Sequence, residues 1–330
     1  MPSLSSYHSF HLDTNCSSVL NIEDVEQLTA AVASNSQFYL LGEGSNTIFL
    51  EDFFGTVIVN RIAGIQMRES SAYYHLRVGA GENWHQLVST ALNNGWYGME
   101  NLALIPGSVG ASPIQNIGAY GLEVGNFIES VEIIDLIDGA SKILTYQECL
   151  FGYRDSVFKN ELAGRVVVTH VNFVLPKKNT LVTSYGELAR LSAPSPRKIF
   201  DEVIRIRQEK LPDPNVTGNA GSFFKNPVIA AHAYQTLQVS HPSIPGFKID
   251  NENVKVPAAW LIDQCGFKGR RVGDVSCHPN QPLVLTNQGK ARGEDVVALA
   301  REIMNEVLNT FDITLEPEVR LVGKEGLITL

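Results

Sequence analysis

Residues 105–121, "IPGSVGASPIQNIGAYG", scatter four glycines among serine, asparagine and glutamine. With no regular apolar period, this segment is a poor candidate for a helix, a strand or part of a core. A long irregular loop is uncommon in a compact domain unless it has a function. We therefore expect it to wrap a large cofactor, whose phosphate and ring edges its backbone N–H groups would contact.

A second Gly-rich turn, "LGEGSN" at 41–46, joins one apolar run to another. Such a turn can direct several N–H groups at an anion, although an ordinary hairpin turn would also explain it. No third glycine follows and no helix opens after it, so the Rossmann fingerprint is absent, and there is no Walker-type phosphate loop. Two such loops on a scaffold that is not a Rossmann fold predict a dinucleotide bound in an extended pose.

The rest of the chain alternates helix and strand patterns. Helical periodicity predicts helices within 21–35, 82–95, 195–214, 257–266 and 293–311. Strand patterns occur at 38–41, 47–50, 56–60, 73–81, 165–175, 282–287 and 313–322, and a hairpin at 129–146 turns at Asp138-Gly139. A chain of 330 residues usually forms two or three domains. We predict an α+β fold with boundaries near residues 62 and 212.

The bulk composition excludes several classes of protein. The net charge of −9 and pI of about 5.4 argue against a nucleic-acid or anionic-membrane binder. No apolar stretch approaches the roughly 20 residues that a membrane span needs, and the N-terminus lacks a secretory pattern. The four cysteines, Cys16, Cys149, Cys265 and Cys277, are scattered without metal-ligand spacing. We expect reduced thiols, a cytoplasmic location and no bound metal.

Ser222 is a candidate for chemistry because it follows a flexible stretch in "GNAGSFFKNP", residues 218–227. It is not the nucleophile of a GxSxG elbow, which this motif does not match. Two interpretations stay open: the hydroxyl caps the N-terminus of a helix, or it donates a proton to a reaction centre.

Several charged residues also have two interpretations. In "FGYRDSVFK", Arg154 either forms a surface pair with Asp155 or binds a carboxylate or enolate with its planar guanidinium. Lys210 and its neighbour one turn earlier, Arg207, either complement a helix dipole or bind phosphate. Glu318 shares one face of the last predicted strand with Arg320, where an exposed strand edge is the ordinary explanation.

Seven motifs occur in an order that resembles the UDP-N-acetylenolpyruvoylglucosamine reductase family over almost the whole chain. They are "LGEGSN", "IPGSVGASPIQNIGAYG", "FGYRDS", "KLPDP", "GNAGSFFKNP", "AAWLIDQCG" and "LEPEVR". The resemblance implies an FAD-binding fold of the vanillyl-alcohol-oxidase type with two subdomains, 1–62 and 63–211. A substrate-binding α+β domain, 212–312, would follow, and a C-terminal strand in 313–330 would return to the FAD-binding part. "LVTSYGEL", which carries Tyr185, resembles the subclass in which a tyrosine-bearing loop closes over the substrate.

The resemblance also implies which residues contact ligands. The FAD diphosphate would meet Gly42, Gly44, Ser45 and Asn46, and the flavin and adenine would be lined by Pro106, Ser112, Ile114, Gly118, Ala119 and Tyr120. The chain departs from close relatives at Ala111, where a serine can stand, and at Ser108, where some have cysteine. The substrate would be held by Tyr153, Tyr185, Lys210, Asn226 and Arg320, with Arg207 as a further candidate.

The family's mechanism would run in two halves. NADPH reduces FAD and NADP+ leaves; UDP-N-acetylglucosamine enolpyruvate then enters, and flavin N5 delivers hydride to the vinyl methylene carbon. Arg154 and Glu318 would stabilise the enolate, with Glu318 protonated, and Ser222 would give the proton. The product, UDP-N-acetylmuramate, is a peptidoglycan precursor, so the expected role is in cell-wall biogenesis, and hence in cell shape and division. The enzyme is expected to be monomeric.

Two other functions remain as alternatives. One is a flavin oxidase of the same fold that passes electrons to oxygen. The other is a nucleotide-sugar-binding module without catalysis. The joint presence of Arg154, Ser222 and Glu318 in their motifs argues against both.

Overall fold

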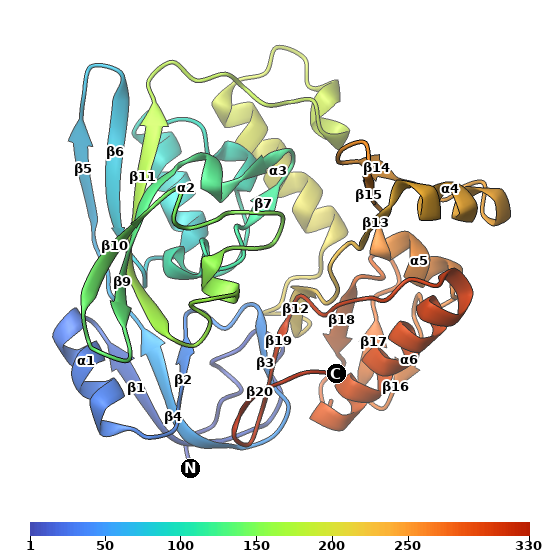
Figure 1. Ribbon diagram of the computed structural model, residues 1–330, viewed down its shortest axis with the longest axis horizontal. Coiled ribbons are helices and arrows are strands. Elements are labelled where there is room, and N and C mark those ends of the chain that lie inside the picture. The colour runs from blue at the N-terminus through green and yellow to red at the C-terminus, as the bar shows by residue number, and fades with distance from the viewer. The chain divides into compact units, whose positions relative to one another are not determined.

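The computed structural model describes residues 1–330, which divide into two compact units (Figure 1). The first unit comprises residues 1–17, 44–54 and 210–330, and the second comprises 18–43 and 55–209. The break before Lys210 lies beside the expected boundary near 212, whereas position 62 falls inside the second unit. The division into three domains therefore stays a prediction.

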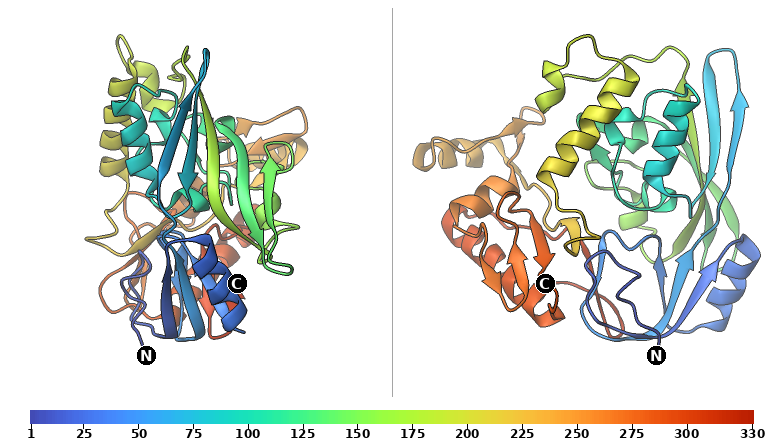
Figure 2. Two further views of the ribbon diagram at one scale, coloured as in Figure 1. Left: turned by 90° about the vertical axis from the view of Figure 1, so that its left-hand side faces the viewer. Right: turned by 180° about the vertical axis from the view of Figure 1, so that it is seen from behind.

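The second unit is built on a five-stranded antiparallel sheet in the order β10-β9-β11-β6-β5. Helices α2 and α3 lie on the same face of this sheet (Figure 2). Buried side chains alternate along β11 because one face of the strand packs on the core. Trp84 and Phe173 lie in this core with their ring centroids 6.0 Å apart. The strands are β5 (Ile65–Glu69), β6 (Tyr73–Gly79), β9 (Ile128–Asp135), β10 (Ser141–Thr145) and β11 (Val166–Pro176), and the helices are α2 (Trp84–Asn93) and α3 (Pro196–Lys210).

A smaller sheet, β1-β4-β2, packs against α1 through a separate cluster that includes Leu28, Ile58 and Val167. Helix α1 begins where the side chain of Asp24 accepts a hydrogen bond from the N–H of Gln27 at 2.7 Å. The elements are β1 (Cys16–Ile22), α1 (Val25–Ser34), β2 (Phe38–Leu41) and β4 (Phe53–Asn60).

The first unit contains three short sheets, β12-β18-β17-β16, β13-β15-β14 and β20-β19-β3, and one continuous core. Helix α6 contributes a buried stripe because Val296, Leu299, Ile303 and Val307 recur at helical spacing. The strands are β3 (Thr47–Phe49), β12 (Asn219–Ser222), β13 (Val228–Ala230), β14 (Phe247–Lys248), β15 (Asn253–Lys255), β16 (Arg271–Val272), β17 (Val275–Cys277), β18 (Val284–Asn287), β19 (Arg320–Gly323) and β20 (Gly326–Ile328). The helices are α4 (Ala231–Ser240), α5 (Ala258–Gln264) and α6 (Gly293–Phe311).

The segment 105–121 is not wholly irregular, because a short 3₁₀ helix and a two-residue strand interrupt it. These are η2 (Val109–Ala111) and β7 (Gly118–Ala119), which pairs with β8 (Leu122–Glu123). The other 3₁₀ helices are η1 (Glu100–Leu102), η3 (Val124–Asn126), η4 (Val157–Lys159) and η5 (Gly186–Arg190).

The five predicted helices are confirmed, and so is the hairpin turning at Gly139, whose φ is +69°. Helix α4 was not predicted, because it buries no residue and its sequence carries no apolar stripe. The predicted strand at 313–322 is wrong in length, since only β19 pairs continuously and Pro317 makes a single bridge with Phe224. Its alternation of buried and exposed side chains is nevertheless confirmed.

Two further observations concern the chemistry of the whole chain. All four cysteines carry free thiols, as expected. No helix combines the length and apolar character needed to cross a membrane.

Candidate functional site

The turn at 41–46 connects β2 to β3 and requires glycine at Gly44. Its φ is +68°, and a Cβ there would overlap the carbonyl oxygen of Tyr7 and lie 2.8 Å from Cα of His8. Only a residue without a side chain fits this backbone approach. In the second unit, a Cβ on Gly42 would meet Oγ of Ser108, so the start of the turn also lies close to segment 105–121.

The donors of this turn are suited to an anion. Ser9 uses its N–H and its hydroxyl to contact the carbonyls of Gly44 and Ser45. The N–H groups of Glu43, Gly44 and Ser45 make no hydrogen bond within the chain. Successive unpaired N–H groups in a turn form an anion-binding nest, so this donor set fits the diphosphate of a dinucleotide.

Glu43 was missed as a site residue although it lies within the motif. Its Oε1 accepts a hydrogen bond from Nδ2 of Asn83 at 2.7 Å, and its Oε2 accepts one from the N–H of Gly107 at 3.2 Å. Asn83 also caps α2 by accepting from the N–H of Gln86. Glu43 therefore holds the 41–46 turn to the start of segment 105–121. A carboxylate between the glycines of an anion-binding turn was the signal that could have found it.

Backbone hydrogen bonds attach segment 105–121 to residues 80–82. The N–H groups of Val109 and Gly110 donate to the carbonyls of Glu82 and Ala80, at 2.8 and 2.9 Å. Ser112 is buried, and both its N–H and its hydroxyl donate to the carbonyl of Val109. The other predicted cofactor residues here are more accessible: Pro106 is exposed, and Ile114, Gly118, Ala119 and Tyr120 are half-buried.

Arg154 lies against the same segment. Its Nη2 donates to the carbonyl of Gly118 at 2.8 Å, and its guanidinium carbon lies 5.6 Å from the ring centroid of Tyr153. The residue is half-buried and has a φ of +53°, an uncommon conformation that tends to occur at functional sites. Asp155 instead accepts from Asn160. The geometry supports the carboxylate-binding interpretation of Arg154 over the exposed surface pair.

Tyr120, Tyr185 and Arg207 form a second group in this unit. The two tyrosine rings are perpendicular with centroids 6.3 Å apart, and Tyr185 is half exposed. Arg207 donates through Nε to the carbonyl of Leu104 at 3.1 Å. Burial lowers the pKa of Arg207, which Tyr120 opposes and the positive charge of Arg154 reinforces. Arg207 is therefore not a solvated cation at a helix end, and this positive region fits an anionic ligand.

In the first unit, Ser222 is the last residue of β12. The pairing of β12 with β18 shifts register between Asn219 and Ser222, where Gly221 has a φ of +71°. Oδ1 of Asn219 accepts from the N–H of Gly221 at 3.0 Å and stabilises this bulge. No helix begins at Ser222, so the helix-cap interpretation is wrong.

Backbone hydrogen bonds place Glu318 beside the residue that follows Ser222 and connect Arg320 to Asn46. The N–H of Glu318 donates to the carbonyl of Phe223, the residue after Ser222, at 2.7 Å. Asn46 donates through Nδ2 to the carbonyl of Glu318 at 3.1 Å and accepts from the N–H of Arg320 at 2.9 Å. The first unit therefore brings together three parts of the chain that are far apart in the sequence: Asn46, Ser222 with its neighbour Phe223, and Glu318 with Arg320.

Two further predicted substrate residues belong to the first unit. Oδ1 of Asn226 accepts from the N–H of Ala258 at 2.9 Å, at the start of α5, so part of this amide has a structural role. Lys210 is exposed at the end of α3. The predicted site residues thus form two groups. The first unit carries Gly44, Ser45, Asn46, Lys210, Ser222, Asn226, Glu318 and Arg320, and the second carries the remainder.

In comparisons with known proteins, two family models match different parts of the chain. The model of an FAD binding domain matches residues 18–145, and that of the UDP-N-acetylenolpyruvoylglucosamine reductase C-terminal domain matches residues 213–322. The chain is 48% identical to the UDP-N-acetylenolpyruvoylglucosamine reductase of Pseudoalteromonas atlantica, over 100% of this chain and 96% of the relative. It is 46% identical to that of Escherichia coli K12, over 99% of this chain and 97% of the relative.

A solved structure is similar over the whole chain. The crystal structure of the UDP-N-acetylenolpyruvylglucosamine reductase from Thermus caldophilus is 26% identical, with a TM-score of 0.66, and 97% of each chain is covered. The expected fold class, an FAD-binding part followed by a C-terminal α+β domain, is confirmed.

Proposed function

This chain belongs to the UDP-N-acetylenolpyruvoylglucosamine reductase family, and we propose that it is an FAD-dependent oxidoreductase that reduces UDP-N-acetylglucosamine enolpyruvate with NADPH. The product would be UDP-N-acetylmuramate, for peptidoglycan synthesis. The observation that carries the proposal is full-length similarity at 48% identity. The hydrogen bond from the N–H of Glu318 to the carbonyl of the residue after Ser222 supports it.

The chain's own residues supply a place for the cofactor. When bound, FAD would carry the hydride between NADPH and the enolpyruvyl group. The N–H groups of Glu43, Gly44 and Ser45 would bind its diphosphate, since they make no hydrogen bond within the chain. The half-buried residues of segment 105–121 would line its rings; these are Ile114, Gly118, Ala119 and Tyr120.

The proton and the developing charge need separate groups. We assign the proton donor to Ser222, whose hydroxyl sits at the end of a strand rather than at a helix cap. Arg154 would bind the substrate carboxylate, because its planar guanidinium stays charged and can donate two parallel hydrogen bonds. Glu318 would donate a hydrogen bond to the same developing enolate in its protonated form.

The substrate is a multiply charged anion, and the chain is acidic overall, so the cations that bind it must be local. Lys210 and Arg320 from the first unit are the candidates for its diphosphate and carboxylate. Tyr153 and Tyr185 from the second unit would make further contacts, with Tyr185 on the loop typical of one subclass. Arg207 is a further candidate, since its region is positive.

Other parts of the proposal concern the whole molecule. We assign residues 1–62 and 63–211 to FAD binding, 212–312 to substrate binding and 313–330 to a returning strand. The pairing of β19 with β3, in which Leu321 lies beside Ile48, is consistent with that return. A monomeric state, a cytoplasmic location and a small molecule as the sole partner complete the proposal.

The visible spectrum of the purified protein tests this function. A flavin spectrum should bleach with NADPH and recover on adding UDP-N-acetylglucosamine enolpyruvate under nitrogen. Rapid oxygen consumption with an alcohol or sugar, and no recovery with the enolpyruvyl substrate, would instead indicate an oxidase. A colourless protein that FAD does not reconstitute would indicate a binding module.

A further inference from the structure

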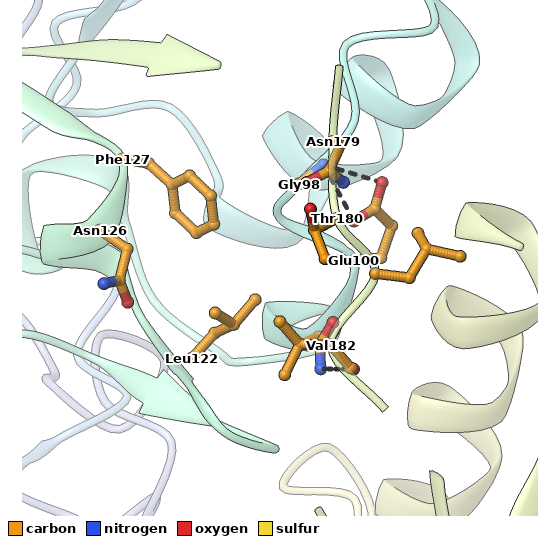
Figure 3. Close-up of a pocket in the computed structure, with 10 residues that line it drawn as sticks. Gly98, Glu100, Leu122, Asn126, Phe127, Asn179, Thr180 and Val182 are labelled. Carbon is orange, nitrogen blue, oxygen red and sulfur yellow. Dashed lines mark hydrogen bonds between the residues drawn. The ribbon is translucent and has the colours of Figure 1, made fainter. Parts of the chain in front are cut away.

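The segment that leads to Tyr185 borders a small cavity. Residues 177–185 connect the end of β11 to η5, and the cavity beside residues 179–182 is about 130 Å³. Figure 3 shows Asn179, Thr180 and Val182 on one side and Leu122, Asn126 and Phe127 across from them. Leu181 of the segment packs against the core of the unit, but the cavity leaves the packing around the segment incomplete.

One hydrogen bond fixes the backbone of this segment. The Nδ2 group of Asn101 donates to the carbonyl of Val182 at 2.9 Å, and residues 178–184 make no other hydrogen bond. Asn101 is 2% exposed, so this contact does not compete with bulk water. The same Nδ2 donates to the carbonyl of Tyr120 at 2.9 Å. One buried amide thus joins the segment to the end of the 105–121 loop.

The two joined backbones bring two tyrosines together. Tyr185 follows Val182 by three residues, and its ring stands perpendicular to that of Tyr120. A Cβ on Gly121 would lie 3.4 Å from Cγ1 of Val182 and 3.5 Å from Cβ of Tyr185, so the loops are already in contact distance. Gly121 has a φ of +87°, which permits this close approach.

We propose that Asn101 is a positioning residue for substrate binding, which holds the Tyr185 segment in place against the Tyr120 loop. The proposal rests on the proposed function, in which Tyr185 contacts the substrate. The two N–H groups of the Asn101 side-chain amide donate to two carbonyls from different loops at once. Without that bridge the segment occupies more conformations, and only a fraction of molecules present Tyr185 in the binding geometry. Apparent substrate affinity falls by that fraction, whereas steps that do not involve Tyr185 are unchanged.

The first test combines Asn101→Ser with a matched control, Asn60→Ser. Asn60 is also a buried asparagine that donates to a backbone carbonyl, that of Val168 at 2.9 Å, away from this segment. Trypsin should cleave N101S after Lys178 several times faster than the wild type, and N60S at the wild-type rate. This readout is independent of the reaction. Equal cleavage of N101S and wild type would overturn the proposal.

The second test separates positioning from a general structural role. N101S should raise the KM for UDP-N-acetylglucosamine enolpyruvate up to about fivefold, the loss expected when the Tyr185 hydroxyl contact itself is removed, with little change in kcat. In a Tyr185→Phe background the same change should have a much smaller effect, because both act on one contact. Additive effects would overturn the proposal. If the wild type itself fails to reduce this substrate, the proposed function is wrong, and the cleavage test still stands.

Asn101→Asp provides a second variant of nearly the same shape. An ionised aspartate donates to neither carbonyl and a protonated one to only one of them, so this variant also loses the bridge and should reproduce the faster cleavage and the higher KM. If both N101S and N101D lose FAD or fail to fold, Asn101 supports the fold as a whole and the proposal is wrong.

Discussion

Oε2 of Glu43 accepts a hydrogen bond from the N–H of Gly107 at 3.2 Å, and this contact joins the two Gly-rich loops. The other oxygen of the carboxylate is occupied by Asn83, the N-cap of α2. Both carboxylate oxygens are therefore used to hold neighbouring segments in place, and the N–H groups of the turn stay available for a cofactor. These two contacts explain why the negatively charged Glu43 lies in a turn that is suited to bind an anion.

Glu43→Gln should weaken FAD binding about tenfold. The amide keeps one acceptor oxygen, but its NH2 group then faces one of the two donors. The dissociation constant is measured by titrating the apoprotein with FAD and following flavin fluorescence. The matched control is Glu82→Gln, which removes the same charge from a side chain that accepts from the N–H of Gly64. An equal effect in both variants would show that net charge, and not the loop contact, matters.

Gly44→Ala should destabilise the protein by about 3 kcal/mol or more and abolish FAD binding, because the new Cβ meets backbone atoms of Tyr7 and His8. Gly139→Ala is the control, since its φ of +69° matches the +68° of Gly44 but a Cβ there meets nothing within 4 Å. That variant should lose only about 1 kcal/mol. Urea unfolding measures both. Similar losses would mean that the close approach at Gly44 relaxes.

Ser222→Ala should leave bleaching of the flavin by NADPH intact and slow recovery by the enolpyruvyl substrate roughly a hundredfold to ten-thousandfold. The substitution removes only the proposed proton donor. Stopped-flow absorbance separates the two half-reactions. Ser276→Ala, in β17 of the same unit, should affect neither. An equal loss in both half-reactions would contradict the assignment of Ser222.

Tyr185→Phe should raise the KM for the enolpyruvyl substrate about fivefold through the loss of one hydroxyl hydrogen bond. The ring contact with Tyr120 is kept, so thermal stability should not change. Steady-state kinetics with NADPH saturating provides the measurement. Tyr73→Phe, at an exposed tyrosine of β6, should behave as wild type. An unchanged KM in Y185F would remove Tyr185 from the substrate site.

Stability should fall as the pH drops from about 6.5 to about 4, and His8 is one cause. Burial lowers the pKa of His8 to about 4, which His11 reinforces and backbone groups of Leu12 and Thr47 oppose. The unfolded chain therefore takes up the proton first, and stability that is complete above pH 6.5 is lost toward pH 4, by up to about 3 kcal/mol. In His8→Gln, the urea-unfolding midpoint should depend less on pH over this range. His232→Gln, at an exposed histidine of α4, should retain the wild-type pH dependence.

Much of the fold was predictable because local patterns were strong. The apolar stripe of α6 and the Asp138-Gly139 turn each specify their own conformation within a few residues. The Gly-rich turn at Gly44 was also recognisable, although the backbone that it accommodates lies far away in the sequence. Helix α4 and the length of the last strand were not predictable, since neither has a local signal.

The candidate site was only partly accessible to sequence analysis. Motif order identified Ser222 and Glu318 as candidates, but whether Ser222 caps a helix or ends a strand depended on its pairing with β18. Glu43 and Asn101 act through hydrogen bonds to backbone groups of other loops, and a backbone carbonyl or N–H has no signature in the sequence.

The strongly periodic secondary structure, the two Gly-rich loops and the family resemblance could all be read from the amino-acid sequence, because they depend on residue type and on motifs of a few residues. The contact of Phe223 with Glu318, the link that Glu43 makes between two loops and the bond from Asn101 to the Tyr185 segment are visible only in the folded chain. Such contacts arise when the chain closes loops of tens to hundreds of residues, and their geometry is set by the packing of the whole unit.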